Sequence, residues 1–301
     1  MGSIIHRSEC PCCGSAKIIK VLTCKDYTVS KKLFDIWECA GCTLRFTQDV
    51  PTQEAIGPYY QSDAYISHTD SEKGLVNKVY KIARNYTLTW KMKLVSHLTG
   101  IKKAGTLLDI GAGTGAFTHR VTTEKWQVTG LEPDPGARAI CQEKYRITLQ
   151  PSENLFQLPS KTFDAVTMWH VLEHVHQLQE YMIEIKRVLK DDGVAFIALP
   201  NYTSKDAKQY GEFWAAYDVP RHLYHFSPQS VKTLATRNGL QVNDTVPMWL
   251  DAYYIAMLSE TYKTGKSALP NAVLSGFKSN LHAGKNKETC SSLVYIIRKA
   301  G

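Results

Sequence analysis

The chain has 301 residues, of which 44% are hydrophobic and 21% are charged. This composition is ordinary for a globular protein, and the length suits one large α/β domain with a small appendage, or two domains. The longest apolar run, residues 293–297, is too short to cross a bilayer, so a membrane-spanning or wholly disordered chain is excluded. The first ten residues hold no apolar export signal, and we therefore expect a cytoplasmic protein.

The chain is moderately basic, with 36 Lys and Arg against 28 Asp and Glu. Residues 261–301 carry seven of the basic side chains and a single acidic one, Glu288. Such a surface suits an acidic ligand, a phosphate-bearing carrier or nucleic acid. A modest excess of positive charge is more often only a solubility feature.

Cysteines mark residues 1–50, where short strand-like segments separate two Cys-x-x-Cys pairs. Each pair can place two thiolates on one turn, so the four together can close a tetrahedral zinc site. The spacing predicts a zinc ribbon whose structural zinc is bound by Cys10, Cys13, Cys39 and Cys42. Cys12 or Cys24 could replace one of these ligands, and a redox or unligated role is the alternative.

Residues 51–100 are predicted to form a linker and a helical lid. Residues 51–72 are rich in Pro, Gly, Tyr and Ser, which is typical of an ordered loop. Residues 72–98 place apolar side chains at three- and four-residue spacing, which predicts one long helix or two short ones. The aromatic and imidazole side chains of the loop are Tyr59, Tyr60, Tyr65 and His68.

Strand and helix patterns alternate through residues 101–301, which predicts one domain built from βαβ units, with a parallel sheet covered by helices on both faces. The predicted strands are 106–110, 127–132, 146–150, 164–169 and 194–200. The predicted helices between them begin at Gly115, Pro135 and Glu173. The last elements are predicted as an irregular stretch, a helix at 228–238, a strand at 240–246, helical segments within 250–289 and a strand at 291–299.

A glycine-rich turn, residues 111–115, follows the first strand of this domain. Without side chains, the turn can press its backbone against a ligand at a helix N-terminus. The turn alone also satisfies the dinucleotide fingerprint. Glu132 ends the next strand, where a carboxylate can accept both hydroxyls of a ribose. Asp109 would repel a pyrophosphate but suits a ligand that carries ammonium and sulfonium charges, and a sheet without any nucleotide is the remaining alternative.

Four segments in order, LLDIGAGTGAF, GLEPD, FDAVTMWHVLEHV and LKDDGVAFIALPN, resemble the motif set of class I S-adenosylmethionine-dependent methyltransferases. The resemblance implies a seven-stranded, doubly wound Rossmann-like sheet whose last strand is an antiparallel insertion. It also implies that the methionine part of the donor is held at the glycine turn by Asp109, Gly111, Gly113 and Gly115. The implied contacts to the rest of the donor are Glu132 to the ribose, Pro133, Asp134 and residues 152–154 to the adenine, and Met168 to His170 to the sulfonium side.

The run WHVLEHVH contains His170, Glu173, His174 and His176. Read alone, H-x-x-E-H is the inverted zincin motif. A zincin needs these residues on one helix, whereas here His170 ends a predicted strand, so the zincin reading fails. Three roles stay open for the run: a divalent metal site completed by His222 or His225, a catalytic base, or a hydrogen-bonded structural cluster.

The segment 213–227 follows the last parallel strand and should cover the acceptor, because ligands of open α/β sheets bind beyond the carboxyl ends of the strands. Aromatic side chains could wall the pocket, namely Trp214, Tyr217, Tyr224 and Phe226. A base and an anion clamp could come from Asp218, Arg221, His222 and His225. The alternative is a packing segment in which Arg221 pairs with Asp218.

The sequence therefore favours a methyltransferase that moves the methyl group of S-adenosylmethionine to an oxygen of a small-molecule or carrier-bound acceptor. Proton removal is assigned to His174, His222 or His225. Nitrogen and carbon acceptors stay open, as does the oligomeric state. Two alternatives remain: an RNA base methyltransferase, which the zinc module and basic tail favour, and a non-catalytic zinc-ribbon binding protein on the same scaffold.

Overall fold

The computed structural model describes residues 3–61, 75–266 and 269–301. Tyr65 and His68 of the predicted loop lie outside the described residues, and so do the side chains of residues 75–82. Among the described residues, no helix combines the length and the apolar character that crossing a bilayer requires.

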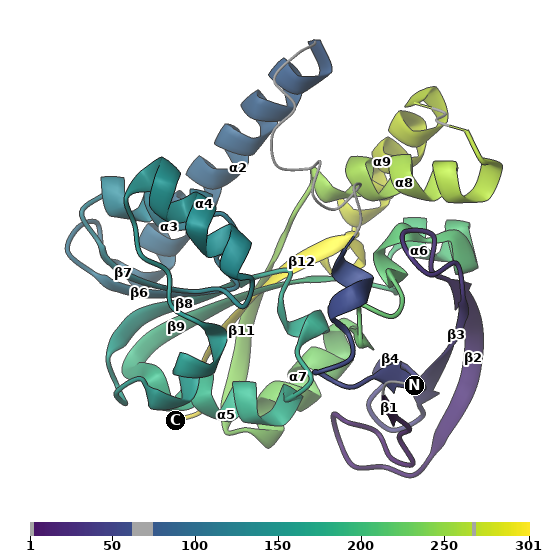
Figure 1. Cartoon of the computed structure of the whole chain (residues 1–301), viewed down its shortest axis with the longest axis horizontal. Coiled ribbons are helices and arrows are strands. Elements are labelled where there is room, and N and C mark those ends of the chain that lie inside the picture. The colour runs from purple at the N-terminus through teal and green to yellow at the C-terminus, as the bar shows by residue number, and fades with distance from the viewer. Residues whose placement is uncertain (1–2, 62–74, 267–268) are drawn as a thin grey trace.

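The N-terminal part forms two small antiparallel sheets (Figure 1). The first pairs β1, Ile4–Ile5, with β5, Val50–Pro51. The second has the order β10-β4-β3-β2 and consists of β2 (Ile18–Lys25), β3 (Leu33–Cys39), β4 (Arg45–Thr47) and β10 (Tyr224–His225). Since β10 comes from the predicted acceptor loop, this second sheet is completed by a strand from the other end of the chain.

The central sheet has six strands in the order β11-β12-β9-β8-β6-β7. They are β6 (Thr106–Ile110), β7 (Gln127–Leu131), β8 (Phe163–Trp169), β9 (Leu189–Pro200), β11 (Leu240–Pro247) and β12 (Ser292–Lys299). The strands β7, β6, β8 and β9 run parallel, and β12 is antiparallel to both of its neighbours. The predicted doubly wound fold with an antiparallel last strand is therefore confirmed.

The predicted count of seven strands is wrong for the described residues, because segment 146–150 forms only an isolated bridge between Gln150 and Leu131. Arg146, which ends the preceding helix, adopts a left-handed conformation with φ 59°. Pro151 follows directly and has no N–H to donate. These two residues leave too little extended chain for a full strand.

Helices cover both faces of the central sheet (Figure 1). One face carries α2 (Leu75–Thr99), α3 (Ala116–Thr123) and α4 (Pro135–Tyr145), and the other carries α5 (Leu178–Val188) and α7 (Pro228–Arg237). Met92 and Val95 of α2 are buried in the same cluster as strand residues of β6 and β9. The helix predicted to begin at Glu173 begins instead at Leu178, because the extended backbone at Val175 separates it from the short 3₁₀ turn η3, Leu172–His174.

Another hydrophobic cluster, separate from the one that contains Met92, joins the four-stranded N-terminal sheet to three helices. These helices are α6 (Lys205–Tyr210), α8 (Asp251–Thr264) and α9 (Leu269–Ala283). Phe34 and Ile36 of β3 lie in this cluster together with Trp214 and Tyr217. The remaining 3₁₀ turns are η1 (Gly57–Tyr60), η2 (Ser152–Gln157), η4 (Gly211–Phe213), η5 (Ala215–Tyr217) and η6 (Lys287–Thr289). The N-terminal sheet is thus packed into the body of the molecule.

Arg221 is the buried charge at the junction of these parts. Its guanidinium donates to both carboxylate oxygens of Asp218, at 2.9 and 2.5 Å. It also donates to Asp26 Oδ1 at 3.3 Å, to Thr28 Oγ1 at 2.9 Å and to the carbonyl of Tyr59 at 3.0 Å. The predicted anion clamp at Arg221 is therefore wrong, because its donors are directed to groups inside the protein, and the packing alternative holds.

The carboxylate of Asp26 provides a test of this junction. Burial opposes its ionisation, but hydrogen bonds from Ser30 and from nearby backbone amides outweigh burial and lower the pKa of Asp26. A lowered folded-state pKa stabilises the protein above the unfolded pKa, and this stabilisation is lost as the pH falls through the folded pKa. Asp26→Asn should therefore reduce the free energy of unfolding by about 3 kcal/mol at pH 7. The deficit should shrink below about pH 4.

Urea unfolding measured across that pH range checks the expectation. The matched control is Asp35→Asn on the same sheet, whose carboxylate pairs with Lys20 and is 39% exposed, and it should cost less than about 1 kcal/mol. Equal losses in the two variants, or a deficit at Asp26 that does not change with pH, would contradict the assignment.

Candidate functional site

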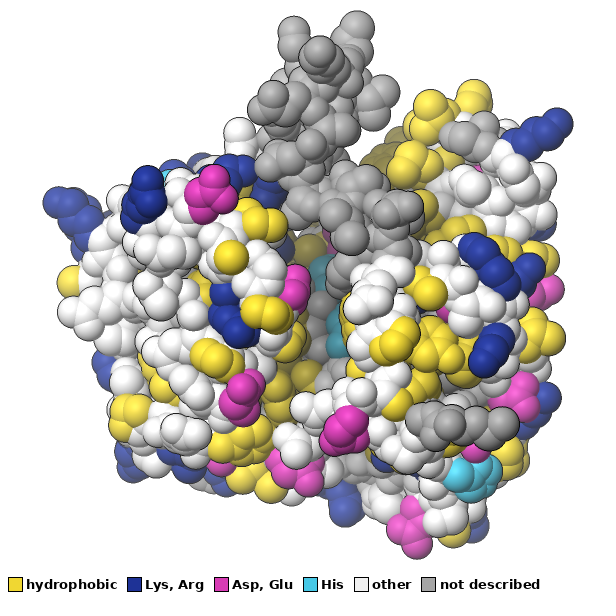
Figure 2. Space-filling view, in the orientation of Figure 1, with side chains coloured by type: hydrophobic (Ala, Val, Ile, Leu, Met, Phe, Trp, Pro, Cys, Tyr) yellow, Lys and Arg dark blue, Asp and Glu magenta, His cyan; other side chains and the backbone are white. Residues whose placement is uncertain are grey.

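The carboxyl ends of the parallel strands meet at one edge of the central sheet, where ligands of open α/β sheets bind. Gly111 follows β6, Glu132 follows β7 and His170 follows β8. Figure 2 shows a deep groove between the part of the molecule that carries α3 and α4 and the part that carries the N-terminal sheet. Histidine side chains are visible on the floor of this groove.

The predicted glycine turn has left-handed backbone at all three glycines, with φ 73° at Gly111, 56° at Gly113 and 77° at Gly115. A side chain at Gly111 would collide with Val171, and one at Gly115 would lie 2.1 Å from the sulfur of Cys141. A Cβ at Gly113 would meet no atom of the residues that the structure describes within 4 Å. Gly111 and Gly115 are therefore needed for packing, whereas Gly113 leaves its backbone accessible to a ligand.

Glu132 lies beside this open position. Its Oε2 accepts the amide of Gly113 at 2.7 Å, and its Oε1 accepts the amide of Asp134 at 3.0 Å. Each oxygen keeps a second lone pair, and burial to 8% exposure raises the pKa of Glu132. Pro133 is exposed next to it, and Asp134 caps α4 by accepting the amides of residues 136 and 137.

Asp109 lies beneath the turn and not in the groove. Its carboxylate is fully buried and accepts the hydroxyls of Thr118 and Thr167, both at 2.8 Å. Burial raises the pKa of Asp109 to about 6. These bonds tie β6 to α3 and β8, so the carboxylate shapes the turn from below, and its direct contact with a ligand stays a prediction.

At the end of β8, Met168 is buried in the core, and the chain then turns through His170, which has φ 58°. Nε2 of His170 lies 3.0 Å from Asp251 Oδ2, and its Nδ1 lies 3.5 Å from Glu173 Oε1. Burial alone would lower the pKa of His170, but these two carboxylates raise it to about 9. Asp251 is the first residue of α8 and was not among the site residues predicted from the sequence. Nothing in the sequence connects it to His170, which lies 81 positions earlier.

Glu173, His174 and His222 form a cluster whose ligand atoms all lie within 4.8 Å of one another. The two imidazole rings meet edge to face, with centroids 4.5 Å apart. Tyr60 Oη lies 3.2 Å from Nδ1 of His174. The structure thus brings together two of the three predicted catalytic histidines.

His225 and His176 have other neighbours. Nε2 of His225 lies 3.0 Å from the hydroxyl of Thr47, and its ring packs edge-on against Tyr217. Burial lowers the pKa of His225 well below its usual range. Nε2 of His176 lies 3.0 Å from the carbonyl of Pro51. These contacts connect both rings to the N-terminal sheets.

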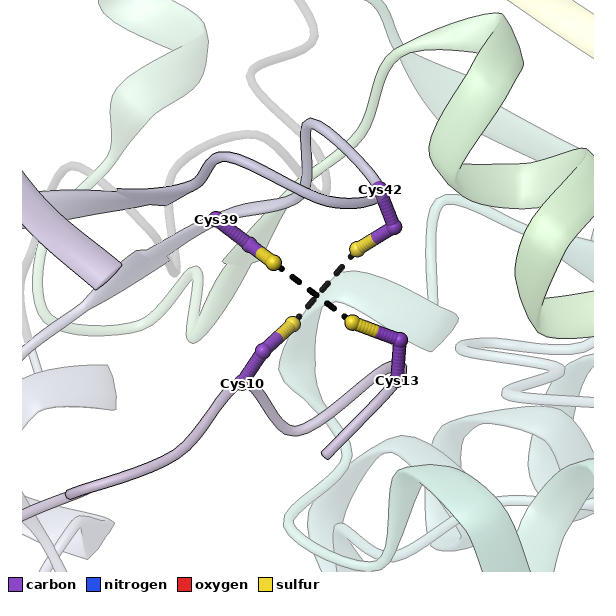
Figure 3. A group of neighbouring side chains, drawn as sticks. All are labelled: Cys10, Cys13, Cys39 and Cys42. Carbon is purple, nitrogen blue, oxygen red and sulfur yellow. Dashed lines mark hydrogen bonds between the residues drawn. The ribbon is translucent and has the colours of Figure 1, made fainter. Parts of the chain in front are cut away.

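The four predicted zinc ligands converge on one point (Figure 3). The sulfurs of Cys10 and Cys42 are 3.5 Å apart, as are those of Cys13 and Cys39. Backbone amides of residues 41 and 42 outweigh burial and lower the pKa of Cys39 to about 7. Cys12 and Cys24 are not part of this group, because Cys12 donates to the carbonyl of residue 230 and Cys24 is buried in the cluster with Trp214.

Comparison with known proteins identifies the family to which the sequence is similar. Residues 82–245, more than half of the chain, match a family described as methyltransferase domain. A ubiquinone biosynthesis O-methyltransferase of Rickettsia bellii is 25% identical over 200 residues, which cover 60% of this chain and 79% of the relative. A demethylmenaquinone methyltransferase of Tropheryma whipplei is 29% identical over 128 residues, which cover 41% of this chain, and the chain spans only about half, 54%, of that relative's length.

Among solved structures, geranyl diphosphate C-methyltransferase from Streptomyces coelicolor A3(2) superposes with a TM-score of 0.52 at 16% identity. The alignment covers 77% of this chain and 88% of that one, and it supports the fold alone. Both the fold and the family expected from the four sequence motifs are confirmed. Since the family match covers more than half of the chain, the protein belongs to the methyltransferase domain family.

Proposed function

We propose that the protein is an S-adenosylmethionine-dependent methyltransferase that acts on an oxygen of a small-molecule or carrier-bound acceptor. The observation that carries the proposal is the open backbone at Gly113 with the carboxylate of Glu132 hydrogen-bonded to it. The relatives named demethylmenaquinone methyltransferase and ubiquinone biosynthesis O-methyltransferase support a small-molecule acceptor.

The residues present fit the donor. S-adenosylmethionine, when bound, supplies an electrophilic methyl group on a positively charged sulfur. Gly113 offers the space that a side chain would fill, and Glu132 offers two oxygens with lone pairs for the ribose hydroxyls. The exposed ring of Pro133 and the turn 152–154 supply the proposed wall for the adenine. Asp109, buried below, adds negative charge that favours a cationic ligand.

The acceptor is proposed to lie in the groove above Glu173, His174 and His222. A hydroxyl must lose its proton before it attacks a methyl group, so the enzyme must align donor and acceptor and remove that proton. The rings of His174 and His222 meet edge to face, and we assign proton removal to one of these two residues. His225 is less suited to this role, because its Nε2 is in contact with the hydroxyl of Thr47.

Glu132→Ala tests the donor site. The substitution removes two charge-assisted hydrogen bonds, each worth roughly 1.5 to 3 kcal/mol, and should weaken donor binding at least tenfold. Calorimetric titration with S-adenosylhomocysteine gives the affinity. The matched control is Glu143→Ala on the exposed side of α4, which should bind like the wild type. If Glu132→Ala bound S-adenosylhomocysteine as tightly as the wild type, the assignment of Glu132 to the donor site would be wrong.

The acceptor class is tested with S-adenosylmethionine that carries a tritiated methyl group. Incubation of the full chain with a cell extract should transfer the label into the small-molecule or carrier-bound fraction, and Glu132→Ala should lower the transfer when the donor concentration is limiting. Label that enters only the RNA fraction would instead favour an RNA base methyltransferase. No transfer into any fraction would favour a non-catalytic binding protein.

We also propose that Cys10, Cys13, Cys39 and Cys42 bind a structural zinc ion and that the protein works in the reducing cytoplasm. Four thiolates complete a tetrahedral site and leave no position open for water, which is typical of zinc that stabilises a fold. The sulfur separations of 3.5 Å suit such a site. Reducing conditions keep the thiols free for metal.

Cys39→Ser should lower the zinc content by one equivalent relative to the wild type, because binding of structural zinc is coupled to folding. The neighbouring Cys12→Ser provides the matched control and should keep its zinc. Metal analysis of protein purified without chelators measures both. Equal zinc in Cys39→Ser and the wild type would exclude these four thiolates as the site.

A further inference from the structure

Glu173 has an unusual environment for a carboxylate. It is fully buried, and among the described residues neither of its oxygens accepts a hydrogen bond. Its nearest cationic group is Nδ1 of His170, 3.5 Å away, and that histidine is also paired with Asp251. A buried carboxylate is costly unless it is paired or coordinates a metal. A further positive charge close to Glu173 would therefore stabilise its buried carboxylate.

The two neighbouring histidines are oriented by backbone carbonyls. Nδ1 of His174 lies 3.1 Å from the carbonyl oxygen of Arg221, and Nδ1 of His222 lies 2.8 Å from that of Ala216. A carbonyl only accepts hydrogen bonds, so each Nδ1 carries the proton, and in the neutral ring Nε2 carries the lone pair. Metal-binding histidines are commonly fixed in this way by a carbonyl behind the ring.

We propose that Glu173, His174 and His222 bind a divalent transition-metal ion. One carboxylate and two imidazoles within 4.8 Å form a three-ligand set that leaves coordination positions open. Imidazole ligands favour zinc, copper, iron or nickel over magnesium, calcium or manganese. The arrangement differs from the cysteine site, whose four thiolates leave no open position.

The place of this site in the fold indicates what the ion does. Val171, two residues before Glu173, is the side chain that fills the space against Gly111 of the donor turn. The ion would therefore lie next to the donor site. If the proposed function holds, on which this role rests, the ion lowers the pKa of the acceptor hydroxyl and so takes over the task assigned to a free histidine base.

The experiment titrates Zn²⁺ into the full chain after the cysteine site has been loaded, without donor or acceptor. Calorimetry and metal analysis should show one additional equivalent. Glu173→Gln and His222→Ala should each weaken this binding by about 10²-fold or more, since loss of a supporting contact alone costs 10 to 100-fold. The matched control is the exposed His282→Ala, which should bind like the wild type.

A wild-type protein that takes up no zinc beyond the thiolate site would overturn the proposal, and so would variants that bind as tightly as the wild type. His222 is 12% exposed, so His222→Ala decides if the buried Glu173→Gln variant does not fold. Because metal binding is measured without methyl transfer, its failure leaves the proposed function standing. A metal-loaded protein that transfers no methyl group would instead refute the function alone.

Discussion

The arrangement of the groove depends on one buried cation. The guanidinium of Arg221 is out of contact with water and is held by two carboxylates, Asp218 and Asp26, that are far apart in the sequence. Its planar fork can serve several acceptors at once, which the single ammonium of a lysine cannot do with the same geometry. The carbonyl of the same residue accepts from His174. A single residue thus joins the N-terminal sheet to the chemistry at the end of β8.

The proposed donor site at the glycine turn has buried carboxylates, whereas the junction at Arg221 has a buried cation. Asp109 lies on β6 and Glu132 directly follows the adjacent strand β7, and burial raises the pKa of each. Lys91 of α2 lies over the ring of Trp169, and burial lowers its pKa to about 8. This distribution of charge supports the proposed binding of a positively charged donor at the site.

The sequence predicted those parts that rest on short-range patterns. The glycine turn, the carboxylate at Glu132 and the two cysteine pairs depend on local spacing, and each lies where the pattern placed it. Contacts between distant segments could not be predicted from the sequence. Neither the partnership of Asp251 with His170 nor the addition of β10 to the N-terminal sheet has a local signature.

The errors have the same origin. Arg221, followed by His222 and then His225, resembles a binding group when read along the chain, and only its distant partner Asp26 reveals that it is structural. The strand expected at 146–150 has the right composition but is bounded by a left-handed Arg146 and by Pro151. At Arg221 a contact with a distant residue decided the outcome. At 146–150 the backbone conformation of Arg146 and the missing N–H of Pro151 outweighed the strand propensity of the residues between them.

The sharing of β10 also determines how the molecule can be divided. Tyr224 and His225 form their ladder with Phe46 and Arg45 of β4, and within the described part of the chain they have no partner strand in the central sheet. A fragment beginning after residue 50 would keep the donor turn but lose the strand against which the segment around His222 is ordered. It would also leave an unpaired strand edge open to aggregation. We therefore expect that residues 1–50 must be kept together with the rest of the chain in any fragment made for reconstitution or for exchange between proteins.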